Sequence, residues 1–200
     1  MMDVKETMRE ILAAESAAIK NIPVSDGYEQ AVKLIVDQVK FCGGKLVTSG
    51  MGKCGQIAQN IATTFSSTGI PAVFLHPSEA QHGDLGVLQP SDVMLLLSNS
   101  GRTREIVELV ALVQALYAGM KFIVITGNPD SELAHHADIC LWTGGAPEVC
   151  PLGLTPTTST TIMTVIGDVL VVNVMKATGF NKHDYALRHH GGYLGVKSRQ

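Results

Sequence analysis

The sequence predicts an α/β protein, a doubly wound three-layer α/β/α sandwich built on a mainly parallel, five-stranded sheet. Short apolar runs alternate along the chain with segments in which apolar residues recur at helical spacing, and glycine-containing loops follow several of the runs. This order is typical of parallel strands joined by right-handed crossover helices that cover both faces of the sheet. No Pro-rich or low-complexity linker divides the 200 residues, so we expect residues 1–200 to form a single domain.

Two helices are predicted within residues 1–40. Apolar residues lie at helical spacing over residues 3–20, and Pro23 ends this helix. A second helix is expected from the N-cap Ser25 to about Phe41, because a pair of glycines then breaks the chain.

The rest of the chain repeats a unit of strand, loop and helix. Strands are expected at the short apolar runs of residues 45–49, 71–75, 92–97, 121–125 and 139–143. Helices are expected over residues 56–67, 105–117 and 158–177. Ligands of such a sheet bind at the carboxyl ends of its strands, so a site is expected in the loops that follow the strands.

The composition excludes several classes of protein. Hydrophobic residues make up 46% of the chain and charged residues 16%, which excludes intrinsic disorder. The net charge is −3 and no block of basic residues occurs, so nucleic acid is not expected as a partner. No run approaches the roughly 18 apolar residues of a membrane span, and residues 1–15 lack the apolar core of a signal peptide. We therefore expect a cytoplasmic protein with no membrane partner, and the low charged fraction favours a surface partly covered by other subunits.

A loop rich in hydroxyl groups follows the third predicted strand. Residues 98–103 read Ser-Asn-Ser-Gly-Arg-Thr and lead directly into a predicted helix. Hydroxyls and free backbone N–H groups at a helix N-terminus form an anion site, to which the helix dipole adds partial positive charge. The loop therefore favours phosphate binding; the alternative is a helix cap with polar neighbours.

A glycine-rich turn follows the first predicted strand. Gly50, Gly52 and Gly55 nearly supply the G-x-G-x-x-G spacing of a dinucleotide site, but no acidic residue closes the next strand about twenty residues on. A nicotinamide cofactor is therefore disfavoured. The glycines instead let the backbone approach a small anionic ligand, with Lys53 pointing into the same pocket; the alternative for Lys53 is a solvated lysine.

Histidines occur in two further segments of interest. Residues 76–84 contain His76, His82 and two acids, a set that fits metal binding or proton transfer. Two histidines are fewer than the three or four ligands that zinc prefers, so they are weak evidence for zinc. His189 and His190 lie near the C-terminus, where position alone predicts an exposed and idle tail.

Several motifs together resemble those of one enzyme family. They are Gly50-Met51-Gly52-Lys53-Cys54-Gly55, His76-Pro77, His82-Gly83-Asp84-Leu85-Gly86, Ser98-Asn99-Ser100-Gly101, Cys150-Pro151-Leu152-Gly153-Leu154, Pro156-Thr157-Thr158-Ser159-Thr160-Thr161, and His189 with Gly191-Gly192 and Leu194-Gly195. In this order they closely resemble the D-arabinose 5-phosphate isomerases, which carry a sugar isomerase (SIS) domain. The resemblance runs from about residue 40 to residue 197.

The resemblance implies an aldose–ketose isomerase that interconverts D-ribulose 5-phosphate and D-arabinose 5-phosphate through an enediol, without a required cofactor. The product supplies the synthesis of Kdo, an acidic sugar of lipopolysaccharide. The resemblance also implies a homotetramer with sites between protomers, and a nucleotide-activated Kdo as a feedback ligand. Relatives usually carry a pair of CBS domains after the SIS domain, and we expect none here because the sequence stops at Gln200.

The resemblance assigns roles to individual residues. The catalytic positions are Lys53, Glu105, Glu148 and His189, and the substrate-binding positions are Ser49, Gly50, His82, Ser98, Ser100 and Thr103. Either carboxylate is expected to remove the proton, while Lys53 steadies the enediolate. His189 is expected to open the sugar ring or shuttle protons across a subunit boundary, on a terminal segment that folds over a pocket. His76 matches a position linked to zinc in relatives, which we interpret as an inhibitory or structural metal.

Two departures from the family pattern and two alternative functions stay open. His190 stands where many relatives have proline and Arg102 where many have an acid; both are expected beside the pocket, where they bear on phosphate affinity and sugar preference. A non-catalytic phosphosugar-binding regulator would keep the hydroxyl loop but has no reason to keep the catalytic positions. A hexulose-phosphate isomerase of the same family is the other alternative, against which the His82 loop and His189 favour the arabinose enzyme.

Overall fold

The structure is a computed structural model that describes residues 3–199. Its sheet consists of β1 (Leu46–Gly50), β2 (Ala72–Phe74), β3 (Val93–Leu97), β4 (Lys121–Thr126) and β5 (Ile139–Trp142). The longer helices are α1 (Val4–Lys20), α2 (Gly27–Ile35), α3 (Lys53–Ser67), α5 (Arg104–Leu116) and α7 (Thr158–Thr178). The shorter ones are the π-helix η1 (Val36–Phe41), α4 (Pro77–Ala80), the 3-10 helix η2 (Asp84–Val87), α6 (Glu132–His135), α8 (Lys182–Ala186) and α9 (Gly192–Lys197).

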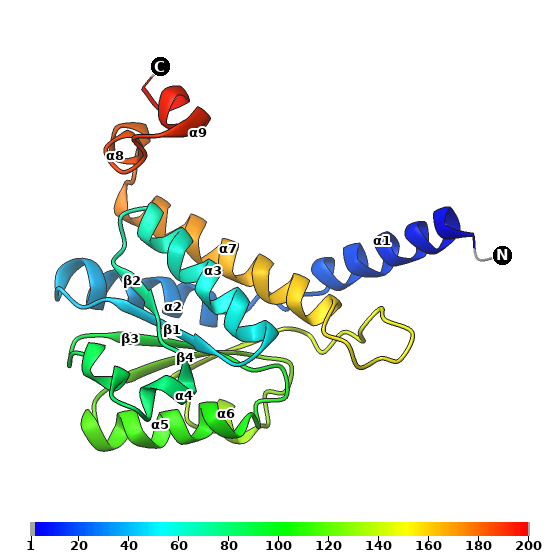
Figure 1. Cartoon of the computed structure of the whole chain (residues 1–200), viewed down its shortest axis with the longest axis horizontal. Coiled ribbons are helices and arrows are strands. Elements are labelled where there is room, and N and C mark those ends of the chain that lie inside the picture. Colours follow the sequence, from blue (N-terminus) through cyan, green and yellow to red (C-terminus); the bar gives the residue numbers. More distant parts are fainter. Residues whose placement is uncertain (1–2, 200) are drawn as a thin grey trace.

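Helices cover both faces of the sheet, as Figure 1 shows, with α2, α3 and α7 on one face and α4, α5 and α6 on the other. Alternate residues of β3 enter the two cores: Leu95 and Leu97 pack with the first group of helices, Met94 and Leu96 with the second. Burial on both faces explains why this strand reads as a continuous apolar run. The predicted three-layer sandwich is confirmed, and every pair of neighbouring strands is parallel.

The order of the strands creates the crevice that a site needs. The strands lie in the order β2-β1-β3-β4-β5, so the winding of the chain changes direction between β1 and β3. Such a switch point opens a crevice outside the carboxyl ends of the two strands. The register places Gly50, the last residue of β1, opposite Leu97, the last residue of β3. The turn after β1 and the loop after β3 therefore leave the sheet side by side.

Helix α7 corrects the expectation about long apolar segments. Among the described residues it is the one helix long and apolar enough by composition to cross a membrane, with a mean hydropathy of 1.5 over an 18-residue window. Half of that window is buried inside the fold, where Ile166 and Leu170 enter the first core. A Cβ at Gly167 would lie 2.6 Å from Cγ1 of Ile61, so α7 crosses α3 in close contact. The packing of a central core helix accounts for this apolar composition.

The two predicted N-terminal helices are confirmed, the second as α2 continued by the π-helical turn η1. Two segments extend away from the sandwich in Figure 1, namely the N-terminal part of α1 and the pair α8 and α9. On α1 the apolar side chains of Val4, Met8 and Leu12 are 65%, 59% and 57% exposed. The body of the protein is thus the sheet with its covering helices, from which the start of α1 and the pair α8 and α9 project.

Asp92, at the amino end of β3, is almost wholly buried. Its carboxylate accepts hydrogen bonds from Nζ and the backbone N of Lys45, at 2.7 and 2.9 Å, and from the backbone N of Gln89 at 2.8 Å. We expect Asp92→Ala to lower the free energy of unfolding by about 3–5 kcal/mol, because it leaves a partly buried charge unpaired. Urea denaturation measures the loss. Lys121→Ala is the control, because it breaks only the more exposed pair with Asp138 and surface pairs are worth about 0–1 kcal/mol; equal losses in the two variants would contradict the role of burial.

Candidate active site

A sharp turn joins β1 directly to α3 and places Lys53 at the start of the helix. A Cβ at Gly50 would lie 2.7 Å from the carbonyl oxygen of Cys54, and a Cβ at Gly55 would lie 2.7 Å from the carbonyl oxygen of Gly50. Gly52 has a φ of 59°, which side chains disfavour. The close approach of strand and helix therefore requires glycine, and it brings Lys53 to the carboxyl edge of the sheet.

The loop after β3 is shaped by its own hydroxyl groups. The hydroxyl oxygens of Ser98 and Thr103 lie 2.8 Å apart, and Oγ of Ser98 also accepts a hydrogen bond from the backbone N of Gly101 at 3.1 Å. Ser98 is buried, whereas Ser100 is exposed, and Oγ of Ser100 accepts a hydrogen bond from the backbone N of Arg102 at 3.2 Å. The loop leads into the N-terminus of the 13-residue helix α5, whose dipole favours an anion. Ser98 and Thr103 thus hold the loop in shape, and Ser100 presents its hydroxyl to the outside.

Glu148 lies between β5 and α7 and caps the N-terminus of α7. Its Oε2 accepts hydrogen bonds from the backbone N and the hydroxyl of Thr157, at 2.7 and 2.9 Å, and from the backbone N of Ser159 at 3.2 Å. Burial alone would raise the pKa of Glu148, but these hydrogen bonds outweigh it and hold the pKa below its usual value. Within residues 3–199 all three bonds engage Oε2, so Oε1 is the oxygen left to act on a ligand.

Cys54 marks the point where three segments meet. Burial raises the pKa of its thiol, a hydrogen bond with the backbone of Asn99 lowers it, and the negative charge of Glu148 raises it again. Its Sγ lies 3.8 Å from Sδ of Met163 on α7. The turn after β1 and the loop after β3 therefore meet beside Lys53, the neighbour of Cys54 in sequence, and the charge of Glu148 reaches Cys54. Glu148 itself lines a separate cavity between α1 and residues 144–151, not the groove of Lys53.

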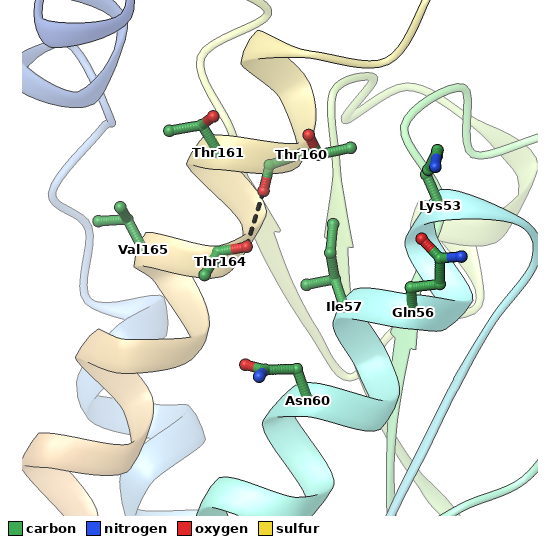
Figure 2. Close-up of a pocket in the computed structure, with 8 residues that line it drawn as sticks. All are labelled: Lys53, Gln56, Ile57, Asn60, Thr160, Thr161, Thr164 and Val165. Carbon is green, nitrogen blue, oxygen red and sulfur yellow. Dashed lines mark hydrogen bonds between the residues drawn. The ribbon is translucent and has the colours of Figure 1, made fainter.

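A groove of about 500 Å³ runs between α3 and α7, with Lys53 at one end (Figure 2). Gln56 and Asn60 of α3 line one side, and Thr160 and Thr164 of α7 line the other. The hydroxyl of Thr164 donates to the carbonyl oxygen of Thr160 at 2.9 Å, the dashed line in Figure 2. Amide and hydroxyl groups beside a single ammonium group suit a ligand that carries both hydroxyls and negative charge.

Glu105 and His82 face a different hollow. This hollow, of about 220 Å³, lies between α4 and α5 and is also bordered by Arg104 and Glu108, whose side chains form an ion pair at 2.6 Å. The structure therefore places Glu105 and His82 on one hollow. Within this chain it does not bring them into the groove of Lys53.

Ser49 is a predicted substrate-binding residue whose hydroxyl is already engaged inside the fold. It is fully buried within β1, and its Oγ donates to the carbonyl oxygen of Leu75 at 2.7 Å. This bond ties the end of β1 to the residue after β2. The structure gives Ser49 a role in joining neighbouring strands, next to the glycine turn that carries Lys53.

His76 follows β2 as the N-cap residue of α4. Its Nδ1 is buried without a hydrogen-bond partner among the described residues, and its ring lies edge-on to Phe74 at 6.2 Å. Within residues 3–199 no group of three or more histidine, cysteine or acidic side chains could hold a metal ion. One histidine falls short of the three or four ligands of zinc, so the described residues do not form a zinc site at His76.

His189 lies at the opposite end of α3 from Lys53. Its neighbour Arg188 packs against Gly69, just beyond that end, where a Cβ would lie 3.1 Å from Cζ of the guanidinium. The 15 residues of α3 span about 22 Å, and Figure 1 shows α8 and α9 projecting beyond the helix. The terminal segment therefore does not cover the Lys53 groove of its own chain. A pocket that this segment closes would have to belong to another chain.

The polar side chains of the groove were not singled out from the sequence. Gln56 and Asn60 follow Lys53 by three and seven residues, a spacing that places all three on one face of a helix. This periodicity was the available signal on α3. On α7, Thr160 belongs to the threonine-rich motif of residues 157–161. The sequence does not show which helix packs against this motif, because that depends on the three-dimensional fold.

Comparisons with known proteins agree with this geometry. Residues 41–173 match the family model of the SIS domain. The arabinose 5-phosphate isomerase KdsD of Shigella flexneri is 45% identical over 196 residues, which is 98% of this chain and 58% of that protein. The protein of the same name from Escherichia coli K12 is 44% identical with the same coverage. The chain thus spans 58% of the length of these curated relatives.

Solved structures match the whole domain. A putative phosphosugar isomerase involved in capsule formation from Bacteroides fragilis NCTC 9343 has a TM-score of 0.94 and 66% identity, covering 96% of this chain and 100% of that chain. The Escherichia coli CFT073 protein c3406, in complex with arabinose 5-phosphate, has a TM-score of 0.83 and 34% identity, covering 94% and 100%. With its family model matched over residues 41–173 and its fold shared along nearly the whole length, the chain belongs to the SIS domain family.

Proposed function

We propose that the protein is an aldose–ketose isomerase that interconverts D-ribulose 5-phosphate and D-arabinose 5-phosphate. The observation that carries the proposal is that the Lys53 turn and the hydroxyl loop leave adjacent strands side by side, with the charge of Glu148 acting on Cys54 between them. An anion site beside an ammonium group and a carboxylate supplies what the enolisation of a sugar phosphate requires. The names of the KdsD relatives and the sugar bound to the Escherichia coli CFT073 protein support this choice of substrate. A cytoplasmic place in the synthesis of Kdo and lipopolysaccharide follows from the same choice.

The reaction is a proton transfer between neighbouring carbons. From the ketose, a base removes a proton from C1, an enediol forms, and return of the proton to C2 gives the aldose. Glu148 is the proposed base, because the bonds that cap α7 leave its Oε1 to act and because its charge reaches Cys54, the neighbour of Lys53. A positioned base contributes about 10²–10⁴-fold, and Lys53 stabilises the enediolate oxygen, a contribution of comparable or larger size. Glu105 and His82 are proposed to hold the sugar from their own hollow, and no cofactor takes part in the step.

The loop after β3 is the proposed phosphate site. We expect Ser98→Ala with Ser100→Ala to raise KM for the sugar phosphate, since two hydroxyls are lost. One hydrogen bond to a charged group is worth about 1.5–3 kcal/mol, which corresponds to about 10- to 150-fold in affinity. Steady-state kinetics measures the change, and Ser91→Ala, beyond the amino end of the same strand, is the control. An unchanged KM in the double variant would place the phosphate elsewhere.

The position of His189 supports a site shared between subunits. In one protomer the imidazole and Lys53 lie at opposite ends of α3, so His189 of one chain would serve the groove of another. We expect the protein to be an oligomer, with a homotetramer as the proposed state, when its molar mass is measured by light scattering. A fully active monomer would contradict the shared site.

A nucleotide-activated Kdo is the proposed feedback ligand. It is formed later in the synthesis that arabinose 5-phosphate supplies, and it carries the sugar hydroxyls and the negative charge that this site would bind. The zinc inferred for His76 finds no set of ligands in the described residues, and no step is assigned to it.

Deuterium exchange tests the proposed chemistry. In D₂O, proton return from the enediol places deuterium on C2 of the arabinose 5-phosphate formed from ribulose 5-phosphate, which NMR detects. A phosphosugar-binding regulator would bind the same sugar without exchange. Formation of unlabelled product would contradict an enediol that equilibrates with solvent, and binding without product would support the regulator.

A further inference from the structure

The terminal segment that carries His189 has a defined internal structure. Helix α8 begins with a reciprocal cap: Oδ1 of Asn181 accepts hydrogen bonds from the backbone N of His183 and Asp184, at 2.9 and 3.1 Å, and Oδ2 of Asp184 accepts one from the backbone N of Asn181 at 3.1 Å. The guanidinium of Arg188 donates to the carbonyl oxygen of Asp184 at 2.9 Å. This short helix is therefore fixed at its start and again one turn beyond.

Arg188 also attaches this segment to the body of the protein. Its Cζ lies 5.6 Å from the centre of the Phe180 ring, at the end of α7, and its guanidinium packs against Gly69 beyond α3. The Phe180 ring in turn meets the Tyr185 ring edge-on at 6.4 Å. Cation–π and edge-on aromatic contacts each favour one orientation of the groups that make them.

The next contact in this series is the imidazole of His189. Its ring stacks on the ring of Tyr185, with the centroids 3.6 Å apart and the planes inclined by only 3°. Its Nδ1 lies 3.0 Å from the carbonyl oxygen of Tyr185, one helical turn earlier. A carbonyl oxygen can only accept a hydrogen bond, so Nδ1 carries the proton of the neutral ring, and the lone pair lies on Nε2.

We infer that Tyr185 is a positioning residue for His189: its ring fixes the plane of the imidazole, and its carbonyl selects the Nδ1–H form. In the neutral ring Nε2 then carries the lone pair, which this arrangement would present to a substrate in the site of another subunit. Tyr185 acts through His189 and does not itself contact the substrate. The consequence for activity rests on the proposed function, whereas the geometry and the tautomer of the imidazole do not.

NMR tests the arrangement without any substrate. The ring current of Tyr185 should move the carbon-bound protons of the His189 ring upfield, and nitrogen-15 shifts should show the Nδ1–H form; His189→Gln assigns the signals. Tyr185→Phe should keep both sets of shifts, whereas Tyr185→Leu, which keeps the backbone carbonyl, should abolish the ring-current shift. Tyr193→Leu is the matched control, because this second tyrosine of the segment is 75% exposed and contacts Lys197. Ring signals of His189 at ordinary positions in the wild-type protein would overturn the inference.

Kinetics then tests the positioning role. We expect Tyr185→Leu to lower kcat by about 10- to 100-fold, the size expected for a slightly misplaced reacting group, with KM little changed. Tyr185→Phe should restore activity, and Tyr193→Leu should retain it. A Tyr185→Leu variant with lost ring shifts but wild-type kcat would overturn the role of Tyr185. If the wild-type protein turns over no sugar phosphate, the proposed function fails, while the NMR result still decides the geometry.

Discussion

Replacing Glu148 by glutamine is expected to lower kcat by about 10²–10⁴-fold, the contribution of a positioned base. The amide oxygen of glutamine can still accept the hydrogen bonds from Thr157 and Ser159, so the cap of α7 is kept while the basic group is lost. Thermal unfolding should show a small cost, since a charge at a helix N-terminus is worth about 0.3–1 kcal/mol. Glu105→Gln is the matched control, and we expect a smaller loss of kcat there. A larger loss in Glu105→Gln would make Glu105 the base.

The dependence on pH gives a second readout of the same variant. The net pKa of Glu148 is lowered in the folded protein, because its hydrogen bonds outweigh the effect of burial. A carboxyl group whose pKa is lower in the folded than in the unfolded state stabilises the fold above its unfolded pKa, and this contribution disappears as the pH falls through the folded pKa. The stability difference between wild type and Glu148→Gln should therefore be present near neutral pH and vanish in acid. A difference that grows as the pH falls would contradict the lowered pKa.

His189→Ala is expected to lower kcat by about 10²–10⁴-fold, because it removes a group that can both donate and accept a proton near neutrality. The melting temperature should hardly change, since the residue lies on a segment that projects from the body. His190→Ala should have far less effect and serves as the control. Equal activity of wild type and His189→Ala would remove His189 from the site, and a collapse in stability would make it a structural histidine.

Mixing two inactive variants tests the shared site more sharply. In Lys53→Ala each groove lacks its ammonium group, and in His189→Ala each terminal segment lacks its imidazole. If one site takes Lys53 and His189 from different chains, mixed oligomers contain some sites with both residues intact. Unfolding and refolding the two variants together should then restore activity, whereas refolding either one alone should not. Failure to restore activity in oligomers shown to be mixed would place both residues in one chain.

The long elements could be predicted because each carries its own periodic signal. Helix α3 and strand β3 are examples, since the first is amphipathic over 15 residues and the second is an apolar run buried on both faces. Helices α4 and α6 were not predicted, because four residues make only one turn and show no period. The length of α7 was predicted to within one residue, since its apolar residues extend from Thr158 almost to its end at Thr178.

The candidate site could be proposed from residue types, but the positions of its residues depend on the fold. The loops that carry Lys53 and Ser100 were identified from glycines and hydroxyls, but their contact depends on the order of the strands, which long-range pairing decides. Ser49 has the residue type of a phosphate ligand, yet the alternation of side chains in β1 turns its hydroxyl to Leu75. His189 could be named from the motif, while its distance from Lys53 required the three-dimensional structure.

The central claim is that this protein interconverts D-ribulose 5-phosphate and D-arabinose 5-phosphate. It is tested most directly by incubating the purified protein with D-ribulose 5-phosphate and, separately, with hexulose and hexose phosphates, and by identifying the sugars formed. The account predicts that arabinose 5-phosphate forms from ribulose 5-phosphate and that the hexose phosphates are left unchanged. Conversion of a hexulose phosphate in preference, or tight binding of ribulose 5-phosphate with no conversion, would contradict it.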